Sequence, residues 1–167
     1  MKWIIKITIT LTFLFISYTI SEGDTVKHNA EYYYKIEEYR YYSLNYESIE
    51  YWTKKYNIKF PEVFIQQVIV ETGELSSLIC LENNNLTGMK FPYKRTTTAI
   101  GSQRGHALYK HWIESIRDYA LWQDFYKCRL NEISTSKEYY KFLEVVSYST
   151  NKRYTKILKR VRVSNHV

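Results

Sequence analysis

The sequence predicts an α+β fold that is mainly α, in which one helical domain carries a small inserted β-hairpin lobe. Apolar residues recur at spacings of three and four before residue 80 and again after residue 112. Between these stretches, glycines and a proline break residues 86–112 into short β-like runs. The length of 167 residues allows one domain with a real core but not two ordinary ones.

The first two helices are expected between residues 45 and 81. A first helix over 45–57 has apolar residues on one face, namely Ile49, Trp52 and Tyr56. Pro61 suits the first position of a second helix, because the N–H that proline lacks has no intrahelical partner there. We expect this second helix to end near 76–81, before a turn at the three asparagines 83–85.

The hairpin lobe is expected from two β-like runs. Residues 95–100 and 106–109 form its strands, residues 101–105 connect them, and a third strand is expected near 89–91. The three remaining helices are expected to begin near Ile113 and to lie near 136–146 and 151–162.

The N-terminus has the features of a secretory signal peptide over residues 1–21. Lysines bracket the start of an apolar run that extends from Ile7 to Ile20, and small residues follow at the exit. The run is shorter than the roughly 20 residues of a membrane span, although an uncleaved anchor helix is the alternative. We therefore expect an exported protein of the cell envelope, with a Tyr-rich leader over 22–44 and one domain over 45–167.

Composition limits the classes of partner. The net charge of +7 favours polyanions, but export argues against intracellular nucleic acid. The 18 tyrosines suit a surface that grips hydroxylated ligands, or reflect compositional bias alone. Cys80 and Cys128 either pair or remain separate thiols, and the spacing of Cys and His predicts no metal site.

Glu71 is the residue on which a catalytic hypothesis can be built. It follows Gln67 by one helical turn and precedes Glu74 by about another, so the three form a polar strip beside the apolar face of the second helix. A carboxyl group at the boundary between core and cleft loses water, which raises its pKa and suits a general acid. The alternative is a solvated glutamate on an exposed edge.

Motifs around Glu71 resemble those of one enzyme family. The segments Gln67-Val68-Ile69-Val70-Glu71-Thr72-Gly73 and Asn84-Asn85-Leu86-Thr87-Gly88-Met89-Lys90 are similar to the Gln-x-x-x-Glu-Thr-Gly and Asn-Asn-Leu-Phe-Gly-Ile-Lys motifs of the glucosaminidases, glycoside hydrolase family 73. The resemblance extends from about residue 57 to 161 and includes 95–98, 104–107 and 115–122, which resemble short members of this family.

The resemblance implies a lysozyme-like fold with a glycan cleft between the helices and the β-lobe. It implies that Glu71 is the general acid for hydrolysis of the β-1,4 bond between N-acetylglucosamine and N-acetylmuramic acid in peptidoglycan. The segment from Tyr148 to Tyr154 is similar to the family's Tyr-Ala-Thr-Asp-x-x-Tyr, which implies that Tyr148 lines the active site. The candidate substrate-binding residues are Gln67, Asn85, Tyr154 and His106, although core packing is the alternative for the tyrosines and a structural role for His106.

The second catalytic group is an open question. Glycosidases commonly use a pair of carboxylates, but no Asp or Glu occurs between Glu82 and Glu114. Glu114 and Glu74 are possible second acids, although Glu114 in a first helical turn also simply favours the helix dipole. The N-acetyl group of the substrate could assist instead.

Three functions follow, in order of preference. The first is a monomeric peptidoglycan hydrolase without a cofactor, without nucleic acid as a partner and without a membrane span once the signal is removed. The second is a lytic transglycosylase on the same polymer, which needs no water nucleophile and therefore suits a missing second carboxylate. The third is a wall-glycan-binding module without activity.

Overall fold

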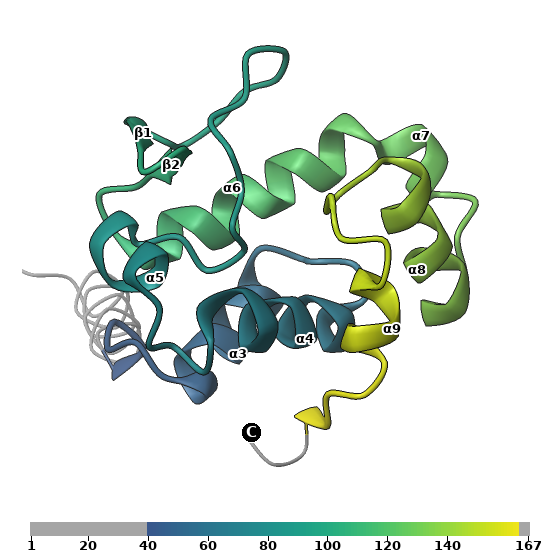
Figure 1. Cartoon of the computed structure of the whole chain (residues 1–167), viewed down its shortest axis with the longest axis horizontal. Coiled ribbons are helices and arrows are strands. Elements are labelled where there is room, and N and C mark those ends of the chain that lie inside the picture. Colours follow the sequence, from purple (N-terminus) through teal and green to yellow (C-terminus); the bar gives the residue numbers. More distant parts are fainter. Residues whose placement is uncertain (1–39, 164–167) are drawn as a thin grey trace, which may run out of the picture. The chain divides into compact units, whose positions relative to one another are not determined.

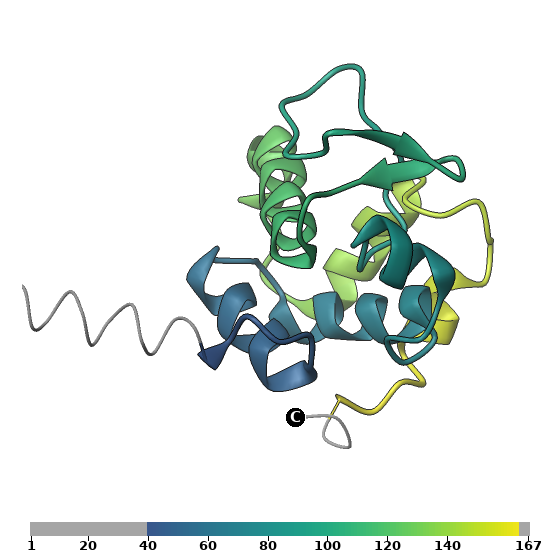
Figure 2. The same cartoon turned by 90° about the vertical axis from the view of Figure 1, so that its left-hand side faces the viewer.

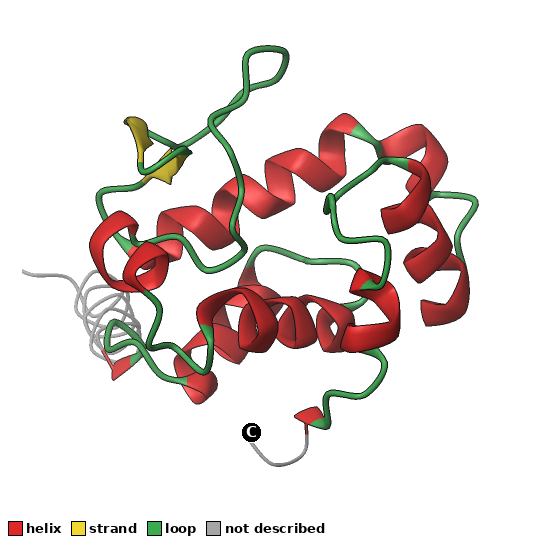
Figure 3. Cartoon of the chain, viewed as in Figure 1, coloured by secondary structure: helices red, strands yellow, loops and turns green. Residues whose placement is uncertain are grey.

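The computed structural model describes residues 40–163, and all elements below belong to the unit that begins at Tyr41. The expected signal peptide, most of the expected leader and the last four residues lie outside the described residues. The expected mainly α fold with a small hairpin is confirmed (Figure 3). The elements are helices α3 (Tyr46–Lys55), α4 (Pro61–Thr72), α5 (Leu78–Asn83), α6 (Trp112–Phe125), α7 (Lys127–Leu130), α8 (Ser136–Val145) and α9 (Tyr154–Leu158), and strands β1 (Gly101–Gln103) and β2 (His106–Leu108).

Helices α3, α4 and α6 enclose the main core. Asn45 caps α3 by accepting a hydrogen bond from the Ser48 amide. The buried apolar residues of this core include Ile49, Phe64, Val68, Ile116 and Tyr119. Figure 1 shows α6 crossing above α4, with the hairpin near one end of α6 and α8 with α9 near the other. A second buried cluster joins α8 and α9 to the rest and includes Val63, Leu143 and Leu158.

The predicted end of the second helix was wrong. Helix α4 ends at Thr72, because Gly73 adopts a left-handed conformation with φ of 54° and donates its amide hydrogen to Ile69. The Thr72 hydroxyl donates to the Val68 carbonyl and accepts from the Leu75 amide, which closes the turn. The chain becomes helical again only at α5.

The hairpin was predicted correctly in kind but not in its bounds. Arg104 and Gly105 both have positive φ and form a two-residue turn, so Gln103 pairs with His106. Residues 95–98, expected as a strand, are bonded to α6 instead: the Thr98 hydroxyl donates to the Glu114 carbonyl. The expected third strand at 89–91 is reduced to one backbone hydrogen bond, in which Met89 O accepts from Ala107 N. Figure 2 shows the two strands side by side above α5.

Of the later helices, the one near 136–146 is confirmed, since α8 covers Ser136–Val145 and has a capping box at Thr135. The expected helix over 151–162 is shorter and covers only α9. Cys80 is buried and Cys128 is exposed, and both are free thiols. None of the helices among residues 40–163 is long and apolar enough to span a membrane.

A buried ion pair fastens the loop before the hairpin to α6. Arg95 donates two hydrogen bonds of 2.8 Å to the two carboxylate oxygens of Asp118, whose side chain is fully buried. The Tyr109 hydroxyl also donates to Asp118, at 2.9 Å. Burial alone would raise the pKa of the Asp118 carboxyl, but hydrogen bonds from Arg95 and neighbouring groups outweigh it and lower that pKa.

Replacing Asp118 with alanine should destabilise the protein by about 3–5 kcal/mol, because Arg95 would be left as an uncompensated buried charge. Urea denaturation measures the change in the free energy of unfolding. The control is Asp124→Ala, which removes an exposed carboxylate of the same helix that lies 4.0 Å from Lys127; we expect a change below about 0.5 kcal/mol. Equal losses of unfolding free energy in the two variants would show that the buried ion pair stabilises the protein no more than an exposed carboxylate does.

Candidate active site

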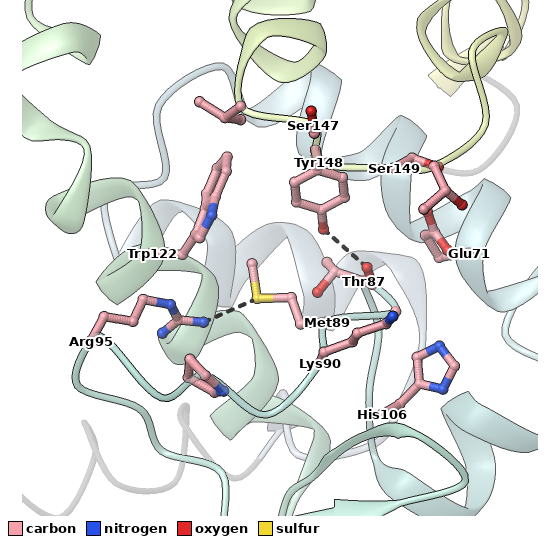
Figure 4. A pocket seen from close by; sticks show the side chains of 14 residues that line it. Glu71, Thr87, Met89, Lys90, Arg95, His106, Trp122, Ser147, Tyr148 and Ser149 are labelled. Atoms are coloured by element: carbon pink, nitrogen blue, oxygen red, sulfur yellow. Dashed lines mark hydrogen bonds between the residues drawn. The ribbon is translucent and has the colours of Figure 1, made fainter.

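Glu71 lies in the last turn of α4, and its carboxyl group faces a pocket. The pocket has a volume of about 480 Å³, which is within the size range of ligand sites. In Figure 4, Glu71 lies on one side of the pocket, and Trp122 and Arg95 lie on the other. The remaining wall comes from three segments: residues 87–92, His106 in β2, and residues 146–150. Within the described residues, Glu71 is the one carboxylate among those that line this pocket.

The backbone at Gly88 presses directly against the Glu71 carboxyl group. A Cβ atom built on Gly88 would lie 2.7 Å from Glu71 Oε2, which is too close for a real contact. Gly88 also has a positive φ of 64°, which side chains rarely adopt. A side chain at this position would therefore be strained by the backbone conformation and would displace the Glu71 carboxyl group.

Tyr148 joins two walls of the pocket. Its hydroxyl donates a hydrogen bond of 2.9 Å to the Thr87 carbonyl, so the segment after α8 is fixed to the loop beside Glu71 (Figure 4). Because this hydrogen is engaged, the Tyr148 oxygen can accept a hydrogen bond from a molecule in the pocket.

The pKa of Glu71 is raised above its ordinary value of 4.5. The largest cause is the loss of water on burial, which disfavours the ionised form. A hydrogen bond from the Tyr154 hydroxyl and the charge of His106 act in the opposite direction and lower the pKa. The net effect favours a carboxyl group that keeps its proton to higher pH than an ordinary glutamate does.

The predicted substrate-binding residues fall into two groups. His106 lines the pocket, and its Nδ1 lies 3.0 Å from the Arg104 carbonyl oxygen. Gln67 and Asn85 are buried and lie outside the pocket lining. Asn85 donates to the carbonyl oxygens of Met89 and Ala107, at 2.9 Å each, and so connects the Glu71-facing loop to the hairpin.

Tyr154 also lies outside the pocket lining, behind Glu71. Its hydroxyl accepts a hydrogen bond of 3.3 Å from Gln67 Nε2. Neither Gln67 nor Tyr154 therefore faces the pocket itself.

The two candidate second acids both lie outside the pocket. Glu74 was expected on the same helix as Glu71, but α4 ends at Thr72 and Glu74 has a positive φ of 60° in the following turn. Glu114 lies in the first turn of α6, where its side chain is 3.7 Å from Arg117. Neither carboxylate lines the Glu71 pocket.

Several pocket residues were not singled out from the sequence. Trp122 and Lys90 belong to segments quoted for the family resemblance, yet a helical tryptophan and a loop lysine give no sign of which way they face. Gly88 had a usable signal, because a glycine next to a catalytic motif suggests a close backbone approach. Within the part of the chain that the structure describes, no group of three His, Cys, Asp or Glu side chains could hold a metal ion.

Comparison with known families identifies one family. The sequence profile of the glucosaminidase family, described as mannosyl-glycoprotein endo-β-N-acetylglucosaminidase, matches residues 46–166. No individual curated protein and no solved structure matches the chain. The matched range covers α3 to α9 and therefore contains Glu71, the hairpin and the segment around Tyr148. The chain belongs to the glucosaminidase family of glycoside hydrolases.

Proposed function

We propose that this protein is an exported peptidoglycan hydrolase that cleaves the β-1,4 bond between N-acetylglucosamine and N-acetylmuramic acid, with Glu71 as the general acid. One observation supports the role of Glu71 most strongly: its carboxyl group is pressed against Gly88 in the wall of a pocket, and burial raises its pKa. A glycosidase acid must be protonated when the leaving-group oxygen departs, and partial burial provides this.

The rest of the pocket suits a polar sugar chain. Tyr148 offers an acceptor oxygen, His106 adds ring nitrogens, and Trp122 provides an aromatic surface opposite Glu71. Sugars present both hydroxyl groups and flat C–H faces, so this mixture fits a glycan better than an apolar ligand. We propose that Tyr148 and His106 contact the substrate, whereas Gln67, Asn85 and Tyr154 position the groups that do.

Because Glu71 is the one carboxylate among the described residues that line the pocket, the second catalytic group has to be sought elsewhere. Glu74 and Glu114 lie outside the pocket, so we propose that neither acts as the base. The N-acetyl group of the sugar can supply internal assistance in its place. The same observation favours one alternative, a lytic transglycosylase, in which a sugar hydroxyl replaces water.

The Glu71→Gln variant should release no wall fragments, because the amide cannot donate the catalytic proton, while its free energy of unfolding should be unchanged or higher. Mass spectrometry of digested peptidoglycan measures the products. The wild type should release reducing N-acetylglucosamine ends, and Glu62→Gln, in the first turn of the same helix, should match it.

Undiminished digestion by folded Glu71→Gln would reject the proposed acid. Products with 1,6-anhydro-muramyl ends would replace the hydrolase by the transglycosylase. Binding to the wall with no fragments from the wild type would instead indicate a glycan-binding module.

The rate should decline as pH rises through the pKa of Glu71, since only the protonated acid is active. Because burial raises this pKa, the alkaline limb of the kcat/KM profile should lie above the ordinary value of 4.5. The charge of His106 lowers the pKa, so His106→Asn should move the limb to higher pH. Profiles recorded at constant ionic strength measure both effects, and a limb that moves to lower pH in His106→Asn contradicts the assignment.

Substitution of Gly88 by alanine should lower activity by more than about tenfold, because the added methyl group displaces the Glu71 carboxyl group. The control is Gly105→Ala, at a φ of 74° with open space around the added atom. Both variants should lose about 1–3 kcal/mol of stability from backbone strain. Only Gly88→Ala should lose activity at a temperature where both remain folded, and equal activity in the two would show that the contact with Glu71 is unimportant.

A further inference from the structure

Five buried polar side chains form a series of hydrogen bonds that crosses the core and ends at Tyr154, whose hydroxyl lowers the pKa of Glu71. We call them the buried polar network, and they are Gln67, Tyr119, Gln123, Tyr139 and Tyr154. They come from four helices, α4, α6, α8 and α9. Consecutive members lie 2.6 to 3.3 Å apart, and each is at most 6% exposed.

The far end of the network has a fixed orientation. The Lys59 backbone amide donates to Gln123 Oε1 at 2.8 Å, and Gln123 Nε2 donates to the Lys59 carbonyl at 2.9 Å. A backbone amide can only donate and a backbone carbonyl can only accept, so the Gln123 side chain cannot be turned over. Its NH₂ group therefore also faces the Tyr139 hydroxyl, at 2.8 Å, and donates to it.

This orientation propagates through the two buried tyrosines. Because Tyr139 accepts from Gln123, its own hydrogen is satisfied only by donation to Tyr119, 2.7 Å away. Tyr119 then donates to Gln67 Oε1 at 2.6 Å. The reverse direction would leave the Tyr139 hydrogen buried without a partner, which is costly in a dry core.

The last step reaches the pocket. With Oε1 held by Tyr119, the Gln67 NH₂ group faces Tyr154 and donates to its oxygen at 3.3 Å. The Tyr154 hydrogen is then left to point towards the Glu71 carboxyl group, whose pKa the Tyr154 hydroxyl lowers. If Gln67 were turned over, its Oε1 would take this hydrogen away from Glu71.

We propose that Gln123 fixes the direction of the buried polar network and thereby makes the Tyr154 hydroxyl donate to Glu71. The members of the network are positioning residues, since none of the five lines the pocket. Donation to Glu71 stabilises the carboxylate that remains once the proton has left. The importance for catalysis rests on the proposed function, but the direction of the network is measurable without substrate.

The experiment reverses the network from its far end. In Gln123→Glu, the group that faces Tyr139 changes from a donor to an acceptor. Tyr139 then donates to residue 123, Tyr119 donates to Tyr139, and Gln67 turns over and takes the hydrogen of Tyr154. Titration of the carbon-13-labelled Glu71 carboxyl group by NMR, assigned with Glu71→Gln, measures the result.

We expect the pKa of Glu71 to rise in Gln123→Glu, as it should in Tyr154→Phe, which removes the hydroxyl group that lowers this pKa. A new negative charge at residue 123 also raises this pKa through space. The double variant Gln123→Glu with Tyr139→Phe keeps the charge and breaks the network, so its pKa should rise less. The matched control adds Tyr140→Phe instead, which removes a neighbouring α8 hydroxyl that bonds to Gln66 at 2.6 Å outside the network, and it should keep the full rise.

An equal rise in the two double variants would overturn the proposal, because charge alone would then explain the effect. Should circular dichroism show that Gln123→Glu is unfolded, neutron diffraction of the wild type decides. A deuteron on Tyr119 directed at Gln67 supports the proposal, and one directed at Tyr139 overturns it. Failure of the wild type to digest peptidoglycan would reject the proposed function without changing either measurement.

Discussion

The close approach of the Gly88 backbone to the Glu71 carboxyl group is the constraint on which the rest of the site depends. The contact holds only if the loop over residues 87–89 stays against the end of α4. Tyr148 holds this loop from the side of α8, and Asn85 connects it to the hairpin. The buried ion pair at Arg95 fixes the following residues to α6. The hairpin lobe, which buries little core of its own, is thus tied to the helical domain at the point where the proposed chemistry occurs.

Burial alone would make Glu71 a poor catalyst, since a carboxyl group that is too reluctant to ionise also gives up its proton slowly. The opposing hydrogen bond from Tyr154 and the charge of His106 keep its pKa from rising further. These two influences come from different sides: His106 faces the pocket, whereas Tyr154 lies behind the carboxyl group. A bound substrate would displace water near His106 but leave Tyr154 untouched. The contribution of Tyr154 to the pKa of Glu71 is therefore constant throughout turnover.

Local patterns predicted α3, the start of α4, α6 and α8, because each of these depends mainly on its own periodicity and caps, but they did not predict α5 and α7. The start of α4 at Pro61, the turn at Asn84 and the position of Glu71 in a pocket wall all followed from such patterns or from the family motif. The end of α4 did not, although a glycine directly after the last periodic residue is itself a helix-stop signal. Residues 95–98 read as a strand because threonines favour strands, yet their partners are on α6, more than fifteen positions away. Gln67 looked like a substrate ligand because its spacing from Glu71 is helical, but the two tyrosines that hydrogen-bond to it come from α6 and α9.

The high tyrosine content has a structural consequence beyond sugar binding or compositional bias. Tyr119 and Tyr139 are fully buried where phenylalanine would fill almost the same volume. A buried hydroxyl group is costly without a partner, so one buried tyrosine requires another polar group beside it, and that group requires a further one. In this core the hydrogen bonds run from Tyr139 through Tyr119 and Gln67 to Tyr154, whose hydroxyl lowers the pKa of Glu71. An ionised carboxylate accepts hydrogen bonds and has no hydrogen to donate, so a series of hydrogen-bonded side chains can end at it. In our proposal, Glu71 is the acceptor for the last hydroxyl hydrogen of this series. The packing of the tyrosine-rich core is then coupled to the protonation of the proposed catalytic group.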